Sequence, residues 1–381
     1  MKHYHYIFTG SGLSALMTVY KMILSEKFQD KTILLIDENS KKNNDRTWCF
    51  WDQDPSEFDE IISKKWNIVL FADKNSKQNL DLKPYQYNMI NGLDFYNLVF
   101  NLIAKQSNIH FINQKIVDFE ELGNHCIVKT ENQSYSCNKI FNSIYNPKLV
   151  KSQTKYPLLQ QHFIGWFIKS KDAVFNSDEA TFMDFSVEQR GNTRFMYVLP
   201  TTSTEALIEY TLFSKEVLPK EEYESEIKNY IEKLGISDYQ IIEKEQGNIP
   251  MTSYKFWKHN TKNIINIGSV GGWTKSSTGY TFKNVTKKSK ALSTFLLTEN
   301  DFRKFHKMDK FWFYDLLFVD VLYKNNELGI KVFSSLFKKG NQTLILEFLD
   351  GETTLWQDLQ VIWKCPKGPF INALLRRMLK G

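Results

Sequence analysis

The segment Tyr4-His5-Tyr6-Ile7-Phe8-Thr9-Gly10-Ser11-Gly12-Leu13-Ser14-Ala15 decides the fold class of this chain. Its first six residues have the apolar and aromatic character of a short buried strand, and the stretch from Leu16 to Leu24 places apolar side chains at helical spacing. A second apolar strand, residues 32–36, is followed by Asp37. A strand, a Gly-x-Gly-x-x-Ala turn, a helix and a strand that ends in an acid are typical of the first βαβ unit of a dinucleotide-binding fold. An ordinary strand-to-helix turn is the alternative interpretation.

The residues of this turn have separate physical roles in such a fold. Gly10 permits the tight turn, and Gly12 lets the backbone approach a pyrophosphate at the N-terminus of the helix. The small Ala15 lets helix and strand pack closely, and Asp37 can accept hydrogen bonds from ribose hydroxyls. We therefore expect the chain to begin with a Rossmann-like domain.

A second glycine-rich turn bears on the length of the cofactor that the chain would bind. An apolar strand, residues 264–267, runs into Gly268-Ser269-Val270-Gly271-Gly272, and Ser276-Ser277-Thr278-Gly279-Tyr280-Thr281-Phe282 leads into a lysine-rich helical stretch. Two such turns, far apart in the chain, suit a long cofactor with two polar ends, which favours FAD. Backbone N–H groups at the start of the second helix could face the flavin ring or its ribityl chain. An ordinary strand, loop and helix would give the same pattern.

Alternating runs between these turns predict an antiparallel sheet. The sequence first predicts a helix over 93–104 and a hairpin over 126–144 that returns to the cofactor sheet. The alternating runs are residues 162–167, 181–185, 194–199 and 206–213, followed by a helix over 220–234, and the chain is helical and aromatic after residue 300. We predict an α/β protein with three parts: a discontinuous Rossmann-like FAD-binding domain (1–150 and 255–300), an antiparallel β substrate domain (151–254) and a helical C-terminal region (301–381) that could contact a membrane.

Composition excludes several classes of protein. The net charge of +6 is too small to indicate a nucleic-acid partner, and four widely spaced cysteines argue against a disulfide scaffold or a zinc module. We expect no metal site, and no segment has the length and apolar character of a membrane span or secretory signal. Aromatic residues make up 15% of the chain, which either a large planar ligand or a codon bias would explain.

Further motifs extend along nearly the whole chain and point to one family. They are residues 45–51 (Asp-Arg-Thr-Trp-Cys-Phe-Trp), 161–166, 182–184, 197–200, 209–211, 247–251, 268–272 and 277–282 (Ser-Thr-Gly-Tyr-Thr-Phe). With these motifs the chain resembles the bacterial lycopene beta-cyclases, flavoproteins of the glutathione-reductase-like superfamily. The blocks at 45–51 and 277–282 are the most specific part of the resemblance.

The resemblance implies an activity and its cofactors. The activity is the acid-initiated, non-redox cyclisation of the linear ends of lycopene and other linear carotenoids to beta-ionone rings, giving gamma-carotene or beta-carotene. It also implies reduced FAD, with NAD(P)H as the electron source, and an isomerase or intramolecular lyase classification. The expected cofactor-binding residues are Gly10, Gly12, Leu13, Ala15, Asp37, Arg46, Gly268, Ser269, Thr278, Gly279 and Tyr280.

The proposed chemistry requires a strong acid in a dry pocket, and Glu209 is the first candidate. It follows Leu207 and Ile208 on an apolar strand, where desolvation would raise the pKa of its carboxyl group and keep it protonated. A solvent-facing Glu209 paired with a lysine is the alternative. Asp184 and Glu245 are further acid candidates, either of which could take the departing proton or stabilise structure.

Two positions depart from the family pattern. The family motif has a second Glu where this chain has Tyr210, which puts a mechanism with two adjacent carboxylates in doubt, and Ser276 replaces a proline that would stiffen the loop. Aromatic rings could stabilise a cation, although core packing would equally explain each of them. The rings in question are those of Trp48, Trp51, Trp166 and Tyr280.

A substrate stored in lipid implies contact with a membrane surface. Residues 275–310 hold nine Lys or Arg and three Asp or Glu, aromatic residues 302–313 lie beside them, and residues 370–380 are apolar and basic. We expect a cytoplasmic protein, peripheral at the inner face of the cytoplasmic membrane; a solvated helix face is the alternative. Rival functions are a FAD-dependent monooxygenase, halogenase or reductase of a hydrophobic substrate, and a non-catalytic carotenoid-binding flavoprotein.

Overall fold

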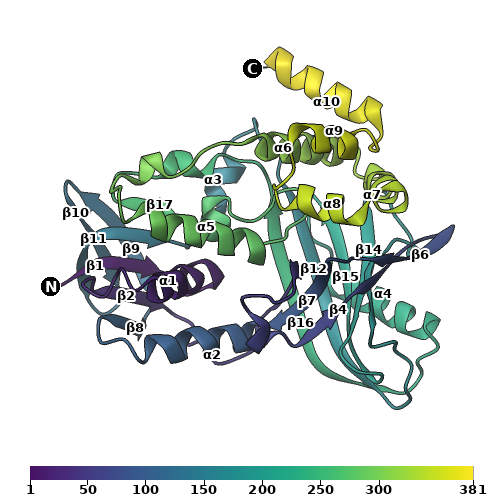
Figure 1. Ribbon diagram of the computed structural model, residues 1–381, viewed down its shortest axis with the longest axis horizontal. Helices are drawn as coiled ribbons and strands as arrows, with labels where there is room; N and C mark the ends of the chain where they lie inside the picture. Colours follow the sequence, from purple (N-terminus) through teal and green to yellow (C-terminus); the bar gives the residue numbers. More distant parts are fainter. Residues whose placement is uncertain (381) are drawn as a thin grey trace.

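The computed structural model describes residues 1–380, apart from the side chains of Lys339 and Lys380. Within this part of the chain, two seven-stranded sheets stand side by side, and a three-stranded sheet accompanies the second of them (Figure 1). Helices of the C-terminal region lie along the second sheet. This arrangement confirms the predicted fold class, a Rossmann-like domain joined to a largely antiparallel sheet and a helical C-terminal region.

The first sheet has the parallel order expected of a Rossmann-like domain. Its strand order is β8-β2-β1-β11-β10-β9, with β17 paired to β11, and β8, β2, β1, β11 and β17 run parallel. The strands are β1 (Lys2–Thr9), β2 (Ile33–Asp37), β8 (Ile109–Asn113), β9 (Ile116–Leu122), β10 (His125–Thr130), β11 (Ser134–Asn142) and β17 (Ile264–Asn266). The predicted hairpin forms β10 and β11, and the predicted helix over 93–104 is α2 (Gly92–Ile103).

Two helices bring the glycine-rich turns together. Helix α1 (Leu13–Ser25) follows the first turn and helix α5 (Phe282–Phe295) follows the second. They pack against one another, and the hydroxyls of Thr18 and Ser289 lie 3.0 Å apart between them. Turns far apart in the sequence therefore open onto the same space. A short helix α3 (Pro147–Lys151) and single turns at 59–61, 256–259, 268–271 and 302–304 complete this half of the molecule.

The second sheet has the strand order β16-β12-β15-β14-β13-β5-β6. Its strands are β5 (Ile68–Asp73), β6 (Ser76–Asp81), β12 (Leu159–Ser170), β13 (Glu179–Asp184), β14 (Thr193–Pro200), β15 (Glu205–Ser214) and β16 (Tyr239–Met251). The small sheet consists of β3 (Thr47–Gln53), β4 (Lys64–Trp66) and β7 (Tyr85–Asn91). The four alternating runs of the sequence are thus β12 to β15.

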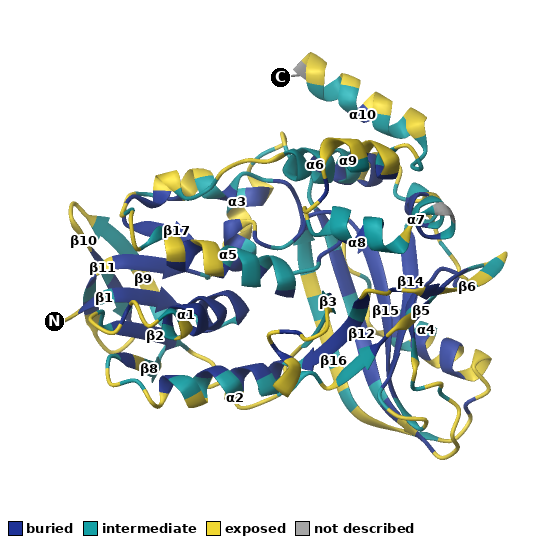
Figure 2. Cartoon of the chain, viewed as in Figure 1, coloured by how far each residue is buried: buried dark blue, intermediate teal, exposed yellow. Residues whose placement is uncertain are grey.

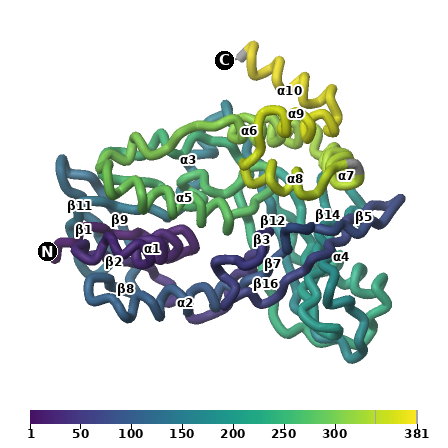
Figure 3. Tube along the Cα trace, viewed as in Figure 1, coloured from purple at the N-terminus to yellow at the C-terminus, as the bar shows by residue number. Residues whose placement is uncertain are grey.

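The predicted boundary of the first domain, residues 1–150, is wrong in one segment. Strand β5 pairs in parallel with β13, so residues 68–81 belong to the second sheet (Figure 3). The buried Val69 and Phe71 give this segment strand character, but a strand does not carry in its own residues the identity of a partner more than a hundred positions away. The chain therefore crosses to the second sheet after β2 and returns at α2.

The second sheet is covered on both faces. On β15, Ile208, Tyr210 and Leu212 pack towards helix α4 (Lys220–Lys233), whereas Leu207 and Phe213 face the opposite side. That opposite side is covered by α6 (Lys310–Lys324), α7 (Leu328–Lys339) and α8 (Gln342–Leu349), whose apolar side chains share one core with the strands. Helices α6 to α8 therefore form a layer on the sheet.

Helices α9 (Leu355–Ile362) and α10 (Lys367–Lys380) end the described chain at its outer edge (Figure 2). Across residues 1–380, no helix combines the length and apolar composition that crossing a bilayer requires.

Candidate functional site

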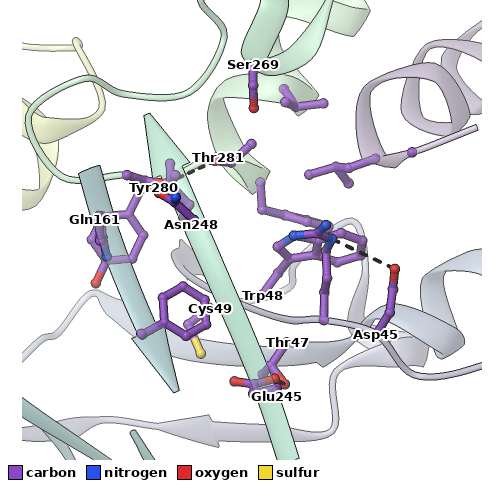
Figure 4. Close-up of a pocket in the computed structure, with 18 of the residues that line it drawn as sticks. Asp45, Thr47, Trp48, Cys49, Gln161, Glu245, Asn248, Ser269, Tyr280 and Thr281 are labelled. Carbon is purple, nitrogen blue, oxygen red and sulfur yellow. Dashed lines mark hydrogen bonds and ion pairs between the residues drawn. The ribbon is translucent and has the colours of Figure 1, made fainter. Parts of the chain in front are cut away.

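A pocket of about 450 Å³ lies where the two glycine-rich turns meet the second sheet (Figure 4). Its walls come from the N-terminus of α1, strand β3, the loop before α5, and the pocket-facing side of β12, β14, β15 and β16. The lining is both aromatic and polar, with Trp48, Tyr87, Phe163, Tyr197 and Tyr280 beside Glu209 and Glu245. The site is therefore built from segments spread over most of the chain.

The first glycine turn leaves room at the start of α1. Gly10 has a φ of +101°, and a side chain there would begin 2.3 Å from the Ser143 hydroxyl oxygen. A Cβ on Gly12 would meet nothing within 4 Å, and no side chain caps α1. Uncapped backbone N–H groups beside open space suit the phosphates of a dinucleotide. Asp37 accepts hydrogen bonds from the Ser11 backbone N–H (2.6 Å) and hydroxyl (3.0 Å), so it holds the turn.

The second turn is closely fitted to its neighbours. Gly268 has a φ of +65°, and a Cβ there would lie 2.5 Å from the Ser14 hydroxyl oxygen of α1. Gly279 has a φ of +74°, and its Cβ would lie 1.9 Å from the Gln161 side-chain oxygen. Glycine at these two positions therefore lets the backbone of the second turn approach the Ser14 and Gln161 side chains.

Buried polar atoms without partners gather beside the second turn. Within the described residues, the Gln161 Oε1, Ser277 Oγ and Thr278 Oγ1 atoms are buried and make no hydrogen bond. Such atoms are costly unless a ligand or water satisfies them, and Gln161 and Thr278 line the pocket. Together with the open space at Gly12, they fit the polar edge and the phosphates of a flavin dinucleotide.

The predicted cofactor residues divide into two groups. Gly12, Leu13, Arg46, Gly268, Ser269, Thr278, Gly279 and Tyr280 line the pocket. Gly10, Ala15 and Asp37 shape the first turn behind it.

Glu209 and Glu245 face the pocket on either side of a glycine. Gly165 of β12 is the register partner of Glu209 on β15 and of Glu245 on β16. A Cβ on Gly165 would lie 3.4 Å from the Glu209 Cβ and 3.2 Å from the Glu245 Cγ. The Thr211 hydroxyl donates to Glu209 at 2.5 Å, and the Thr47 hydroxyl donates to Glu245 at 2.8 Å. The absence of a side chain at Gly165 thus lets the two carboxyl groups approach one another.

Burial and the closeness of the two carboxyl groups favour a retained proton on the pair near neutral pH. Burial raises the pKa of Glu209 well above its usual range, the negative charge of Glu245 raises it further, and the Thr211 hydrogen bond opposes the shift. Burial raises the pKa of Glu245 to about 7, opposed by hydrogen bonds from Thr47 and Glu209. Glu209 is only 8% exposed, so the solvent-facing alternative is wrong.

The replacement of the family's second Glu by Tyr210 does not deprive the pocket of a carboxyl group. Tyr210 points to the α4 face, where its hydroxyl oxygen lies 3.2 Å from a guanidinium nitrogen of Arg194. A Glu at this position would face the same way, because successive residues on a strand point to opposite faces. The second carboxyl group of the pocket comes from Glu245 on another strand.

Asp184 and two of the tryptophans lie outside the pocket. Asp184 accepts from the Tyr230 hydroxyl (2.7 Å) and the Ser186 backbone N–H (2.8 Å), so it joins β13 to α4. Trp166 is buried in the α4-side core, and Trp51 packs edge-on against Tyr280 with ring centroids 4.8 Å apart. Trp48 and Tyr280 do line the pocket.

A group of phenol hydroxyls was not predicted from the sequence. The Tyr280 hydroxyl lies 3.3 Å from that of Tyr87 and 3.5 Å from that of Tyr197. Burial raises the pKa of all three, so they are neutral. Tyr197 and Gln161 fall within the family motifs, but Tyr87 lies on β7, a strand that the sequence analysis left unassigned.

A parallel sheet with two glycine turns, facing a second sheet across a polar-aromatic pocket, defines the flavoprotein class of α/β fold. Solved structures share it at about the same length. A flavoprotein/dehydrogenase from Cytophaga hutchinsonii is 10% identical, with 100% of both chains covered and a TM-score of 0.61. A geranylgeranyl bacteriochlorophyll reductase-like protein from Thermoplasma acidophilum is 10% identical, with 98% of this chain and 96% of that chain covered and a TM-score of 0.58.

A third similar structure, a variant of the halogenase PltM, was solved in complex with FAD. It is 12% identical, with 94% of this chain and 83% of that chain covered and a TM-score of 0.59. At these identities the likeness concerns the fold alone. No curated protein sequence matches the chain. The family is nevertheless clear: residues 6–375 match the model described as lycopene cyclase protein, and the chain belongs to that family.

Proposed function

We propose that this protein is a lycopene beta-cyclase, which closes the linear ends of lycopene into beta-ionone rings without net oxidation or reduction. The observation that carries the proposal is the Glu209–Glu245 pair, two carboxyl groups held at raised pKa in an aromatic pocket beside a dinucleotide-shaped cradle. Ring closure needs a proton donor that stays protonated near neutral pH and a pocket wall that does not react with a carbocation. Leu199, Leu207 and the pocket aromatics provide such a wall.

Glu209 is the proton donor in this mechanism. Its proton adds to the terminal double bond of the polyene, the neighbouring double bond attacks the resulting cation, and a proton then leaves the new ring. The Thr211 hydroxyl stabilises the carboxylate left on Glu209.

Glu245 is assigned as the acceptor of the departing proton. Glu245 is partly exposed and loses its proton near pH 7. It can therefore be a carboxylate, and accept a proton, while Glu209 is still protonated. Before the reaction the proton is on Glu209. While the cation exists, neither glutamate carries a proton, and after the ring has formed Glu245 carries the proton that left it. The number of protons on the enzyme is therefore unchanged over the reaction.

The residues of the cradle would hold FAD. The α1 N-terminus and Gly12 would contact its phosphates, and Gln161, Thr278 and the Gly279 backbone would meet its flavin end. Bound in its reduced, anionic form, FAD would supply a negative charge beside the cation in a site of low dielectric constant. NAD(P)H is the proposed source of electrons.

Expression in a lycopene-accumulating host tests the function. The expected result is conversion of the red pigment to gamma-carotene or beta-carotene, and no conversion by the Glu209→Gln variant. Unchanged lycopene in the presence of folded, flavin-containing protein would contradict the proposal. A monooxygenase, halogenase or reductase would consume NAD(P)H in proportion to product, whereas a cyclase would need reductant only to keep its flavin reduced.

A further inference from the structure

Helices α9 and α10 expose an unusual number of large apolar side chains. Trp356 and Trp363 are each 71% exposed and Leu379 is 87% exposed. The exposed apolar set of these two helices is Leu355, Trp356, Leu359, Trp363, Ile371, Leu375, Met378 and Leu379. On each helix these residues recur at intervals of three and four, so they form one outward face per helix. We call these eight residues the α9–α10 face.

Polar contacts connect both helices of the α9–α10 face to the rest of the protein. Arg377 donates two hydrogen bonds of 2.6 Å to Asp320 of α6 and a third to the Lys155 carbonyl oxygen. On α9, Asp358 is fully buried and pairs with Lys310 at 2.6 Å. One side of each helix is thus bonded to the body, the apolar side chains on the other side are exposed, and both helices lie at the edge of the molecule (Figure 1).

The exposed charges on α9 and α10 themselves are all positive. Residues 354–380 contain five Lys or Arg and one acid, and that acid is the buried Asp358. Lys367 is exposed and lies over the Trp363 ring at 3.5 Å, and Arg376 is partly exposed. Exposed apolar side chains flanked by cations, with no exposed carboxylate between them, complement a surface that has an anionic outer layer over an apolar interior.

The basic segment 275–310, which the sequence also suggested for membrane contact, has fewer free cations and exposed rings than its composition indicates. Three of its nine cations, Lys275, Lys283 and Lys287, pair with Asp315, Asp350 and Glu352. Phe302 is completely buried, and Phe311, Trp312 and Phe313 are only partly exposed. Part of its positive charge therefore joins α5 and the loop before α5 to the C-terminal helices.

We propose that the α9–α10 face docks on the surface of an anionic lipid bilayer, with both tryptophans at the level of the headgroups. Tryptophan beside lysine is favoured at that level, where the ring is partly apolar and the cation meets lipid phosphate. Docking does not depend on the proposed cyclase chemistry, because it rests on the outer surface alone. It would bring a lipid-dissolved substrate to the protein without a membrane-spanning helix.

Flotation of the purified full chain with vesicles tests this proposal. We expect binding to vesicles of phosphatidylglycerol and phosphatidylcholine, at least tenfold weaker binding to phosphatidylcholine alone, and weaker binding at high salt. The double variant Trp356→Glu and Trp363→Glu should lose at least tenfold in binding. The matched control, Val117→Glu with Ile242→Glu, changes exposed apolar side chains on β9 and β16 and should bind like wild type.

Three outcomes would overturn the proposal. They are no binding to anionic vesicles, equal binding by the tryptophan variant and its control, and a stable dimer in light scattering that the tryptophan variant dissociates. The last would assign the face to a second copy of the chain. Because all four substituted side chains are exposed, thermal unfolding should be unchanged and loss of binding cannot be ascribed to misfolding. Pigment conversion, measured separately in detergent, tests the cyclase proposal.

Discussion

Glu209 and Glu245 approach one another across Gly165, a single residue of the strand that separates theirs. Two buried carboxyl groups on either side of one residue cannot both ionise easily, because their negative charges repel. The pair therefore retains a proton at a pH where isolated glutamates have lost theirs. This relationship gives the pocket an acid, and most of the predictions below concern it.

Removal of either carboxyl group should separate their roles. Glu209→Gln should lower the rate of ring formation by about 100-fold or more, because the proton donor is lost. Glu245→Gln should lower it by about 10- to 100-fold, because an alternative acceptor can replace it only inefficiently. Turnover of lycopene in detergent by purified, flavin-loaded protein measures both. Equal activity of Glu209→Gln and wild type would exclude Glu209 as the acid, and unchanged flavin content serves as the folding control.

The pair should also set the pH dependence of stability. Each glutamate binds its proton more tightly in the folded state than in the unfolded state, so stability is lost as pH rises from the unfolded pKa near 4.5 through about 7 for Glu245. Glu245→Gln should therefore be more stable than wild type at pH 8, by on the order of 2 kcal/mol, and not at pH 4. Urea unfolding at the two pH values measures this difference. A stabilisation that is the same at both would contradict the raised pKa.

A methyl group at Gly165 should separate the carboxyl groups. Gly165→Ala would place a Cβ 2.8 Å from a terminal methyl of Leu207 and 3.2 Å from the Glu245 Cγ. Leu207 can move, so the protein should fold and keep its flavin, while turnover falls at least tenfold. Gly368→Ala, where nothing lies within 4 Å, is the matched control and should be fully active. Full activity of Gly165→Ala would show that close approach of the two groups is not needed.

Tyr210 should matter for packing and not for chemistry. Tyr210→Phe removes the hydroxyl beside Arg194 and should cost about 1 kcal/mol of stability, with turnover within about twofold of wild type. Denaturant unfolding and pigment turnover check the two parts. A loss of turnover comparable to that of Glu209→Gln would place Tyr210 in the reaction.

The open space at Gly12 predicts a variant that folds but does not bind flavin. Gly12 has a φ of −74°, which valine tolerates, and a Cβ there meets no atom within 4 Å. Gly12→Val should thus melt like flavin-free wild type while losing most bound flavin, since the side chain would occupy the space offered to phosphate. Absorbance of the purified protein and flavin released on denaturation measure the loss. Normal flavin content in Gly12→Val would place the cofactor elsewhere.

Local sequence determined much of the first sheet and of the second. The Gly10–Ala15 turn, the strands on either side and the alternating runs of β12 to β15 each carry their pattern within a few residues, because side-chain period and glycine conformation are local properties. The same patterning indicated that Glu209 lies on an apolar strand. The sequence pattern could not say whether Glu209 lies on the pocket face or the α4 face of the second sheet, nor that Asp184 lies on the α4 face.

Only the tertiary structure decided which side chains meet in the site. Strand β5 joins β13, Glu245 comes to Glu209 across Gly165, and Tyr87 meets Tyr280, each through pairing between segments that no local pattern connects. Lys283 and Lys287 likewise pair with Asp350 and Glu352, acids that lie beyond the basic window 275–310 in the sequence. A carboxyl pKa, a cofactor cradle and a surface depend on distances between such segments, and those distances exist only once the chain has folded.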